Sequence, residues 1–295
     1  MIKQQTDFRS RRVKLRPEDF ALSDGREPSA SDMVSPETWK SMVSLPDDVS
    51  LRTSDHHGSC LEELWQLWGE WNCLVGGLQR AVPNPSDSPI AHAASEATDY
   101  LQSAIFNALV GYYRLAFASL RGIVENMTIG LHLELAQDAG TFSTWLEGNE
   151  LGLKWAADHV VKHPRVKSVE SRLALATGDD LFHQHQRRVH QGGLVRRLFR
   201  VLSRYAHGAP NFNDGDMWES NGPVYVPKVF QHWAEIYFTT YALAVLEARL
   251  GQPQLGELPW GASHDAKGLF TRALRQIQPS SDAKRLLAAV PESVW

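Results

Sequence analysis

Four arginines and one histidine share one side of a predicted helix, Leu194–His207. At 100° per residue, its apolar side chains fill one arc of about 160°. The remaining arc holds Arg196, Arg197, Arg200, Ser203, Arg204 and His207. A histidine with a pKa near 6.5 can move a proton close to neutral pH, and an arginine fork can stabilise charge on a phosphate. These residue types therefore suit acid–base chemistry on a phosphate-bearing substrate.

No acidic residue balances these charges nearby. From Leu181 to Asn213 the sequence has six arginines, four histidines and no Asp or Glu. Removing these six positive charges from the net charge of −4 leaves −10 for the rest of the chain. Solvated helix faces usually mix charges of both signs. The cationic face therefore requires an anionic partner, which is either a phosphate-bearing ligand or acidic residues from elsewhere in the fold.

A second segment has the opposite character. A helical pattern opens at Ser88 and Pro89, runs to about Ala136, and is apolar nearly all round from Leu101 to Leu133. Within it, one polar line lies inside about 60° of the helical wheel. Its members are Ser103, Asn107, Arg114, Arg121, Glu125, Thr128 and His132. A buried charge must be paired or do chemistry. Arg121 and Glu125 either form a structural ion pair or face the cationic helix across a shared site.

The other elements that must position these residues are also helical. Helical spacing is expected over about 59–78, 141–147, 152–162, 165–176, 180–191 and 227–250, and strand-like alternation is confined to 223–226. We therefore predict an all-α helical bundle. Its domains are an extended or disordered polar and basic arm over 1–57, a helical domain over 58–265 and a helical tail over 266–295. Order should begin at Ser59, where Ser59 and Glu62 fit a capping box. The basic arm is either a solvated tail or a segment that touches nucleic acid.

The sequence Arg200-Val-Leu-Ser-Arg-Tyr-Ala-His207 fits R-x6-H, and it resembles the R-x4–6-H motif of the HEPN superfamily of small helical domains. The upstream segment from Tyr113 through Arg121 to Glu125 is similar to the long helix of HEPN-like proteins linked to abortive infection and phage defence. So is the ending with Ser203, Tyr205 and His207, which Gly208 follows. The resemblance covers roughly residues 90–250.

This resemblance implies a metal-independent RNA endonuclease that leaves 2′,3′-cyclic phosphate ends and acts as a homodimeric defence or toxin effector. His207 would be the general acid/base and Arg200 would contact the phosphate. The further phosphate contacts would be Arg197, Arg204 and Arg196, with Arg121, Glu125, Ser203 and Tyr205 in support. One position departs from the pattern, because Val201 stands where active members usually have a polar residue. The alternative is a non-catalytic HEPN-like module that binds nucleic acid or an acidic protein of a defence system.

Other chemistry finds less support. His159 and His163 are spaced to hold a metal from one helix face, which would suit a metal-dependent hydrolase, but no third ligand is evident. Two cysteines without a CxxC pairing encode neither a disulfide framework nor a thiolate zinc site. No run reaches the roughly 18 apolar residues of a membrane span. We expect no metal, no cofactor, no membrane and a cytoplasmic location.

Overall fold

A computed structural model describes residues 35–177, 180–182, 193–207 and 223–256 of the 295-residue chain. Within these residues every regular element is a helix and no strand occurs, so the predicted all-α class is confirmed. The α-helices are α1 (Pro36–Ala81), α2 (Pro89–Leu109), α3 (Tyr113–Ala136), α4 (Ala139–Leu146), α5 (Leu153–Val160), α6 (Pro164–Thr177), α7 (Leu194–His207) and α8 (Pro227–Gly251). Two short 3₁₀ helices, η3 (Pro85–Asp87) and η5 (Pro253–Gly256), complete the described elements.

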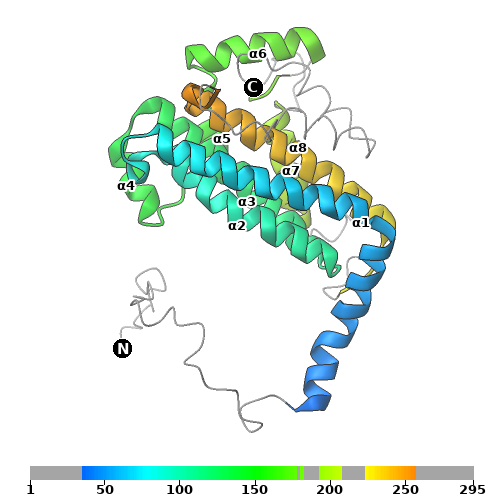
Figure 1. Cartoon of the computed structure of the whole chain (residues 1–295). Coiled ribbons are helices and arrows are strands. Elements are labelled where there is room, and N and C mark those ends of the chain that lie inside the picture. The colour runs from blue at the N-terminus through cyan, green and yellow to red at the C-terminus, as the bar shows by residue number, and fades with distance from the viewer. Residues whose placement is uncertain (1–34, 178–179, 183–192, 208–222, 257–295) are drawn as a thin grey trace, which may run out of the picture.

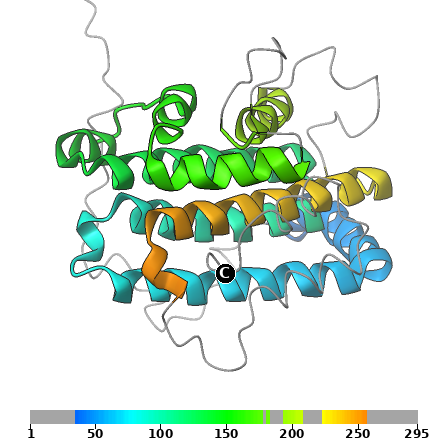
Figure 2. The ribbon, with the colours of Figure 1, turned by 90° about the horizontal axis from the view of Figure 1, so that it is seen from above.

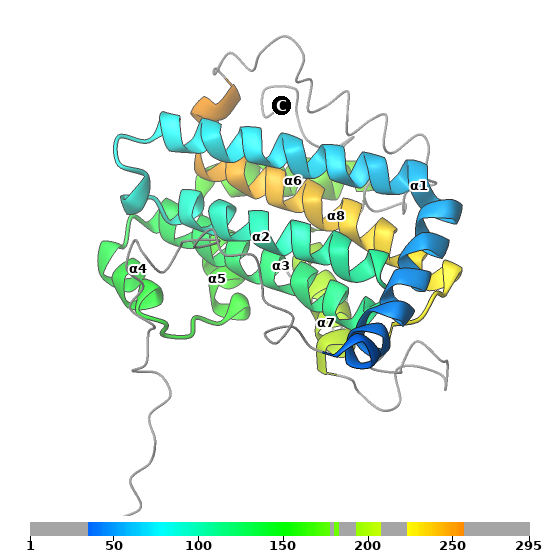
Figure 3. The ribbon, with the colours of Figure 1, turned by 60° about the horizontal axis from the view of Figure 1, so that its bottom comes forward.

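The α2–α3 hairpin is the centre of the bundle (Figure 1). The second half of α1 packs along α2, where the indole Nε1 of Trp71 donates to the carbonyl of Ala94 at 3.0 Å. Helix α8 lies against α3 and α2, and it runs between α1 and the layer that contains α6 in the view from above (Figure 2). Helices α5 and α7 both pack on α3. The α4 and α7 helices lie toward opposite ends of the bundle (Figure 3).

The chain turns where one long helix from Ser88 to Ala136 was predicted, and that prediction is wrong. Gly111 adopts φ +81°, and a Cβ atom there would lie 2.3 Å from the carbonyl oxygen of Val224. This close approach requires glycine and ends α2. The apolar pattern concealed the break because both helices are largely buried. The predicted polar line is consequently divided, with Ser103 and Asn107 on α2 and its other members on α3.

Helix α1 begins earlier than the sequence suggested. Ser35 caps it, with the side-chain oxygen accepting from the backbone N–H of Thr38 at 3.2 Å. Residues 36–56 are therefore helical, which corrects the extended conformation expected there. Residues 1–34 of that arm lie outside the described residues. The backbone leaves helical geometry at His57 (φ −132°, ψ 21°), two residues before the predicted start at Ser59. The part of α1 that precedes this kink projects from the body of the bundle (Figure 1).

The remaining predicted helices correspond to α4, α5, α6, α7 and α8, with ends that differ by at most a few residues. The predicted tail over 266–295 and most of the predicted stretch 180–191 fall outside the described residues, and the described residues 180–182 are not helical. None of the helices in the described part combines the length and apolar character that crossing a membrane requires.

Candidate functional site

Helix α7 presents its two sides as the sequence pattern requires. Its apolar side enters the main core through Leu194, Val195, Leu198, Leu202 and Tyr205, all of which are buried. The Tyr205 ring stacks on Phe117 of α3, with ring centroids 4.0 Å apart. Arg200 and Arg204 are exposed, and Arg197 is half-buried. We call these three arginines the arginine face.

A buried carboxylate holds the segment that precedes α7. Glu170 of α6 accepts from the backbone N–H groups of Leu181 at 2.7 Å and of Phe182 at 2.5 Å. The carbonyl of Leu181 in turn accepts from the backbone N–H of Val195 at 3.0 Å, in the first turn of α7. At Gly193 a Cβ atom would lie 2.4 Å from that same carbonyl oxygen, so the approach needs glycine. Glu170 thus fixes the start of the cationic helix through backbone groups.

Arg121 of α3 reaches the polar side of α7. Its Nε donates to the hydroxyl of Ser203 at 3.1 Å, and its Nη2 lies 3.3 Å from the carboxylate of Glu125. Its guanidinium carbon also lies 4.6 Å from the centre of the Phe199 ring, in cation–π geometry. The side chains of Arg121 and Glu125 are 28% and 27% exposed, so both reach solvent. Arg121 and Glu125 therefore form an ion pair and also lie beside the polar side of α7.

Arg196 has an internal acidic partner. Its Nη2 pairs with the carboxylate of Asp158 on α5 and lies 3.5 Å from the carbonyl of Lys154. The Arg196 side chain is 13% exposed, whereas that of Asp158 is 52% exposed. Of the two kinds of partner that the sequence left open, Arg196 has the internal one. Because only 13% of its side chain is exposed, we leave Arg196 out of the arginine face, although it was among the predicted phosphate contacts.

The predicted acid/base residue, His207, is the last residue of α7. Its side chain lies outside the described part of the structure, so its position relative to Arg200 stays a prediction. The helix places the two residues almost two turns apart on similar sides of the axis. Tyr205, predicted to support the site, is buried and stacks on Phe117.

One residue near this site was missed in the sequence. The Nε2 atom of His232 on α8 lies 3.1 Å from the hydroxyl of Tyr205. Burial lowers the pKa of His232, and Glu235 opposes that shift. A lone histidine early in an apolar helix was the available signal, but nothing in the sequence indicated that it would meet α7.

The described residues contain no group of three or more side chains that could hold a metal ion. His159 is on α5, with its Nδ1 2.8 Å from the carbonyl of Trp155, whereas His163 lies beyond the end of that helix. The metal-site alternative supposed that the two histidines share one helix face, and in the structure they do not.

Comparisons with known proteins return no relative. No protein-family model matches the chain, and no curated protein or solved structure matches it. The fold and the site define a helical protein with an arginine-bearing helix on its surface, and membership of the HEPN superfamily stays a prediction from the sequence motif.

Proposed function

We propose that this protein binds RNA at the arginine face and cleaves it without a metal ion, with His207 as the proton carrier. The observation that carries the proposal is the hydrogen bond from Arg121 to Ser203. It places the positive charge of a further arginine, from α3, beside the polar side of α7. The ion pair with Glu125 and the ring of Phe199 hold the Arg121 guanidinium in place. A preorganised guanidinium is the group that stabilises charge on a phosphate under attack.

The proposed reaction is an internal transfer at phosphorus. His207 takes the proton of a ribose 2′-hydroxyl or delivers one to the leaving 5′-oxygen. A bond forms between the 2′-oxygen and phosphorus, and the bond between phosphorus and the 5′-oxygen breaks. The products carry a 2′,3′-cyclic phosphate and a 5′-hydroxyl. Arg200, with Arg204 and Arg197, supplies the positive charge that binds the RNA backbone.

A second candidate function is binding without cleavage. Val201 follows the motif arginine, and it is a partly buried side chain that packs against the core. It therefore offers the RNA no polar group where active HEPN members usually have one. On this alternative, the arginine face docks nucleic acid or an acidic protein partner, and His207 transfers no proton.

The remaining elements of the proposal come from the HEPN resemblance. We propose a cytoplasmic homodimer that acts as a defence or toxin effector and is controlled by a partner protein of the same system. Each of these properties can be wrong while RNA cleavage is right, since none of them enters the chemical step.

The test compares the wild-type protein with His207→Ala and a matched control, His159→Ala, an exposed histidine on α5. Each is incubated with labelled total RNA in EDTA, and the fragment ends are identified. We expect wild type and His159→Ala to yield new fragments with 2′,3′-cyclic phosphate ends and His207→Ala to lose about 10²–10⁴-fold in rate. If none of the three cleaves but all bind RNA, the non-catalytic alternative replaces the nuclease. Equal cleavage by wild type and His207→Ala would remove His207 from the mechanism.

A further inference from the structure

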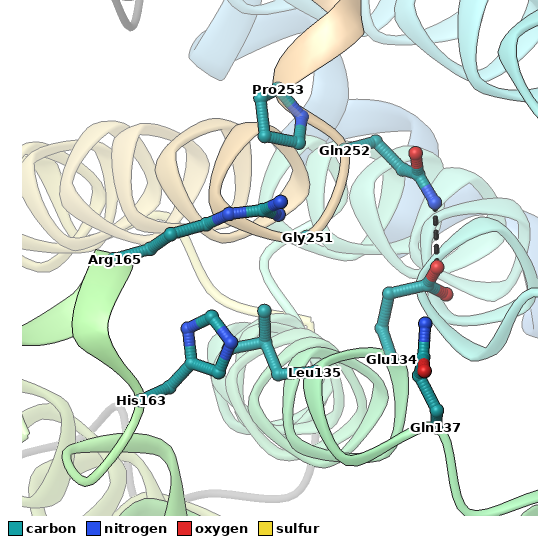
Figure 4. A pocket seen from close by; sticks show the side chains of 8 residues that line it. All are labelled: Glu134, Leu135, Gln137, His163, Arg165, Gly251, Gln252 and Pro253. Atoms are coloured by element: carbon teal, nitrogen blue, oxygen red, sulfur yellow. Dashed lines mark hydrogen bonds between the residues drawn. The ribbon is translucent and has the colours of Figure 1, made fainter.

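A polar cavity lies where the ends of three helices meet, away from the arginine face. It has a volume of about 210 Å³. Its walls come from the end of α3, the start of α6 and the end of α8, and they comprise Glu134, Leu135, Gln137, His163, Arg165, Gly251, Gln252 and Pro253 (Figure 4). Glu134 is 13 residues beyond Arg121 on α3, which is about 20 Å along the helix axis. The cavity is therefore distinct from the proposed RNA site.

The two sides of this cavity carry opposite charge. Arg165 and His163 lie on one side, and Glu134, Gln137 and Gln252 lie on the other (Figure 4). The last turns of α3 and α8 add the negative ends of two helix dipoles to the side of Glu134. The cavity thus has a cationic pole and an anionic pole, with Leu135 and Pro253 between them.

The anionic pole retains acceptor capacity. One carboxylate oxygen of Glu134, Oε2, accepts from the Ser88 hydroxyl at 2.7 Å and the Ile90 backbone N–H at 3.2 Å. The other, Oε1, accepts a single hydrogen bond, from the Gln252 amide at 2.6 Å. A carboxylate has about four acceptor positions, so Oε1 has one left. Gln252 and Gln137 also line the cavity, and each carries a side-chain carbonyl that can accept a hydrogen bond.

The cationic pole has unused donors. In the described part of the structure, His163 Nδ1 is buried without a hydrogen-bond partner, and the exposed Arg165 lines the cavity beside it. Burial lowers the pKa of His163, and the neighbouring Arg165 lowers it further. A neutral imidazole beside a guanidinium can present one N–H together with the guanidinium fork, which is suited to a carboxylate.

We propose that this cavity binds a small zwitterion of the free α-amino-acid type, with the carboxylate at Arg165 and His163 and the ammonium at Glu134, Gln137 and Gln252. At about 30 Å³ per water molecule, the cavity has room for about seven water-sized groups. This admits an amino acid with a small side chain, such as serine, alanine or valine. The bound molecule would join α3, α6 and α8 and stabilise the folded protein.

The first measurement is binding of L-serine, L-alanine and L-valine to the full chain by titration calorimetry, with thermal unfolding in parallel. We expect at least one of them to bind and to raise the unfolding temperature. Its N-acetyl and methyl-ester forms, which each lose one charge, should bind at least about tenfold more weakly, as expected for loss of a charge-assisted hydrogen bond. If none of the three amino acids binds, or if either modified form binds as well as the parent, the proposal is wrong.

Two variants locate the binding. Arg165→Gln removes the cationic pole, and Gln137→Gly removes an acceptor while suiting the left-handed backbone at that residue (φ 53°). Each should weaken binding at least about tenfold. Lys167→Gln, which removes an exposed charge from the same helix without touching the cavity, should bind like wild type. Equal affinity of Arg165→Gln and Lys167→Gln would place the amino acid elsewhere and overturn the proposal. RNA cleavage is a separate readout, so either proposal can fail alone.

Discussion

Helices α7 and α8 both carry charged residues, but they place them in opposite environments. On α7 the arginines lie on the outer side, and Arg200 and Arg204 are exposed. On α8 every residue from Tyr237 to Gly251 is buried, including Glu247 at 0% and Arg249 at 6% exposure. Arg200 and Arg204 of α7 can meet a ligand, whereas Glu247 and Arg249 of α8 act on the stability of the fold. The comparison shows why counting charged residues alone does not locate a functional site.

The cost of buried charge is visible on α8. One oxygen of Glu247 accepts from the Thr128 hydroxyl at 2.8 Å, and the other is buried without a hydrogen-bond partner in the described part of the structure. Burial raises the pKa of Glu247 to about 8, although the hydrogen bond from Thr128 opposes the shift. The carboxylate of Glu170 on α6, which anchors α7, instead receives two backbone N–H groups. A buried acid is therefore tolerated either by taking up a proton or by accepting hydrogen bonds.

The largest effect should come from removing the anchor of α7. Glu170→Ala would leave the N–H groups of Leu181 and Phe182 buried without acceptors, at a cost of about 2–5 kcal/mol in the free energy of unfolding. Urea unfolding of this variant and of Glu150→Ala, an exposed acid, measures the difference. The control should change by no more than about 0.5 kcal/mol. A loss below about 1 kcal/mol for Glu170→Ala would mean that other contacts hold α7.

The second largest effect should be a pH dependence of the unfolding free energy that Glu247 of α8 causes. The folded protein holds the Glu247 proton up to a pKa of about 8, against an ordinary value of 4.5. Glu247 therefore contributes most to stability at low pH, and this contribution is lost as the pH rises from about 4.5 to about 8, by up to about 1.4 kcal/mol per pH unit.

Glu247→Gln should remove that slope. Because several histidines have lowered pKa values and act in the opposite direction, the quantity to follow is the difference between wild type and variant in unfolding free energy across this pH range. Glu96→Gln, an exposed acid on α2, is the control and should follow the wild-type profile. Parallel profiles for wild type and Glu247→Gln would show that Glu247 is ionised in the folded protein.

The contrast between α7 and α8 also shows what the sequence can reveal. The sidedness of α7 was predictable because fourteen consecutive residues encode it. The turn at Gly111 was not, because its cause is a contact with Val224, more than a hundred residues away. The helix over 36–56 was missed because its polar composition, with Pro46 inside, resembles that of a loop.

The partners of the site residues show the same limit. Arg121 and Glu125 are one turn apart, and their ion pair was among the possibilities that the spacing raised. The contacts of Glu170 with Leu181, and of Arg196 with Asp158, join separate elements and follow no spacing rule. Helix periodicity thus identifies which residues share a face, and tertiary packing decides which residues from other elements they contact.

The third prediction compares two arginines of the same helix. Arg200 is exposed, whereas Arg196 is 13% exposed and paired with Asp158. In a His207→Ala background that prevents cleavage, Arg200→Gln should weaken binding to single-stranded RNA and reduce the slope of log affinity against log salt by about 0.7, the value for one phosphate contact. Arg196→Gln should leave the slope unchanged. Equal effects of the two substitutions would contradict the division of these arginines into ligand-binding and structural groups.

The smallest effect on stability should come from Asp158→Asn. The Asp158 side chain is 52% exposed, and ion pairs near the surface contribute about 0–1 kcal/mol, so unfolding should change by less than about 1 kcal/mol. Its effect on RNA binding is the more informative quantity. Without the carboxylate, Arg196 is released from its ion pair and can join the arginine face, so the salt slope should become steeper by up to about 0.7. Measured beside Arg196→Gln in the same His207→Ala background, an unchanged slope would mean that Arg196 does not reach the RNA even when released. The position of Arg196 on the helix, rather than its pairing with Asp158, would then define the edge of the arginine face.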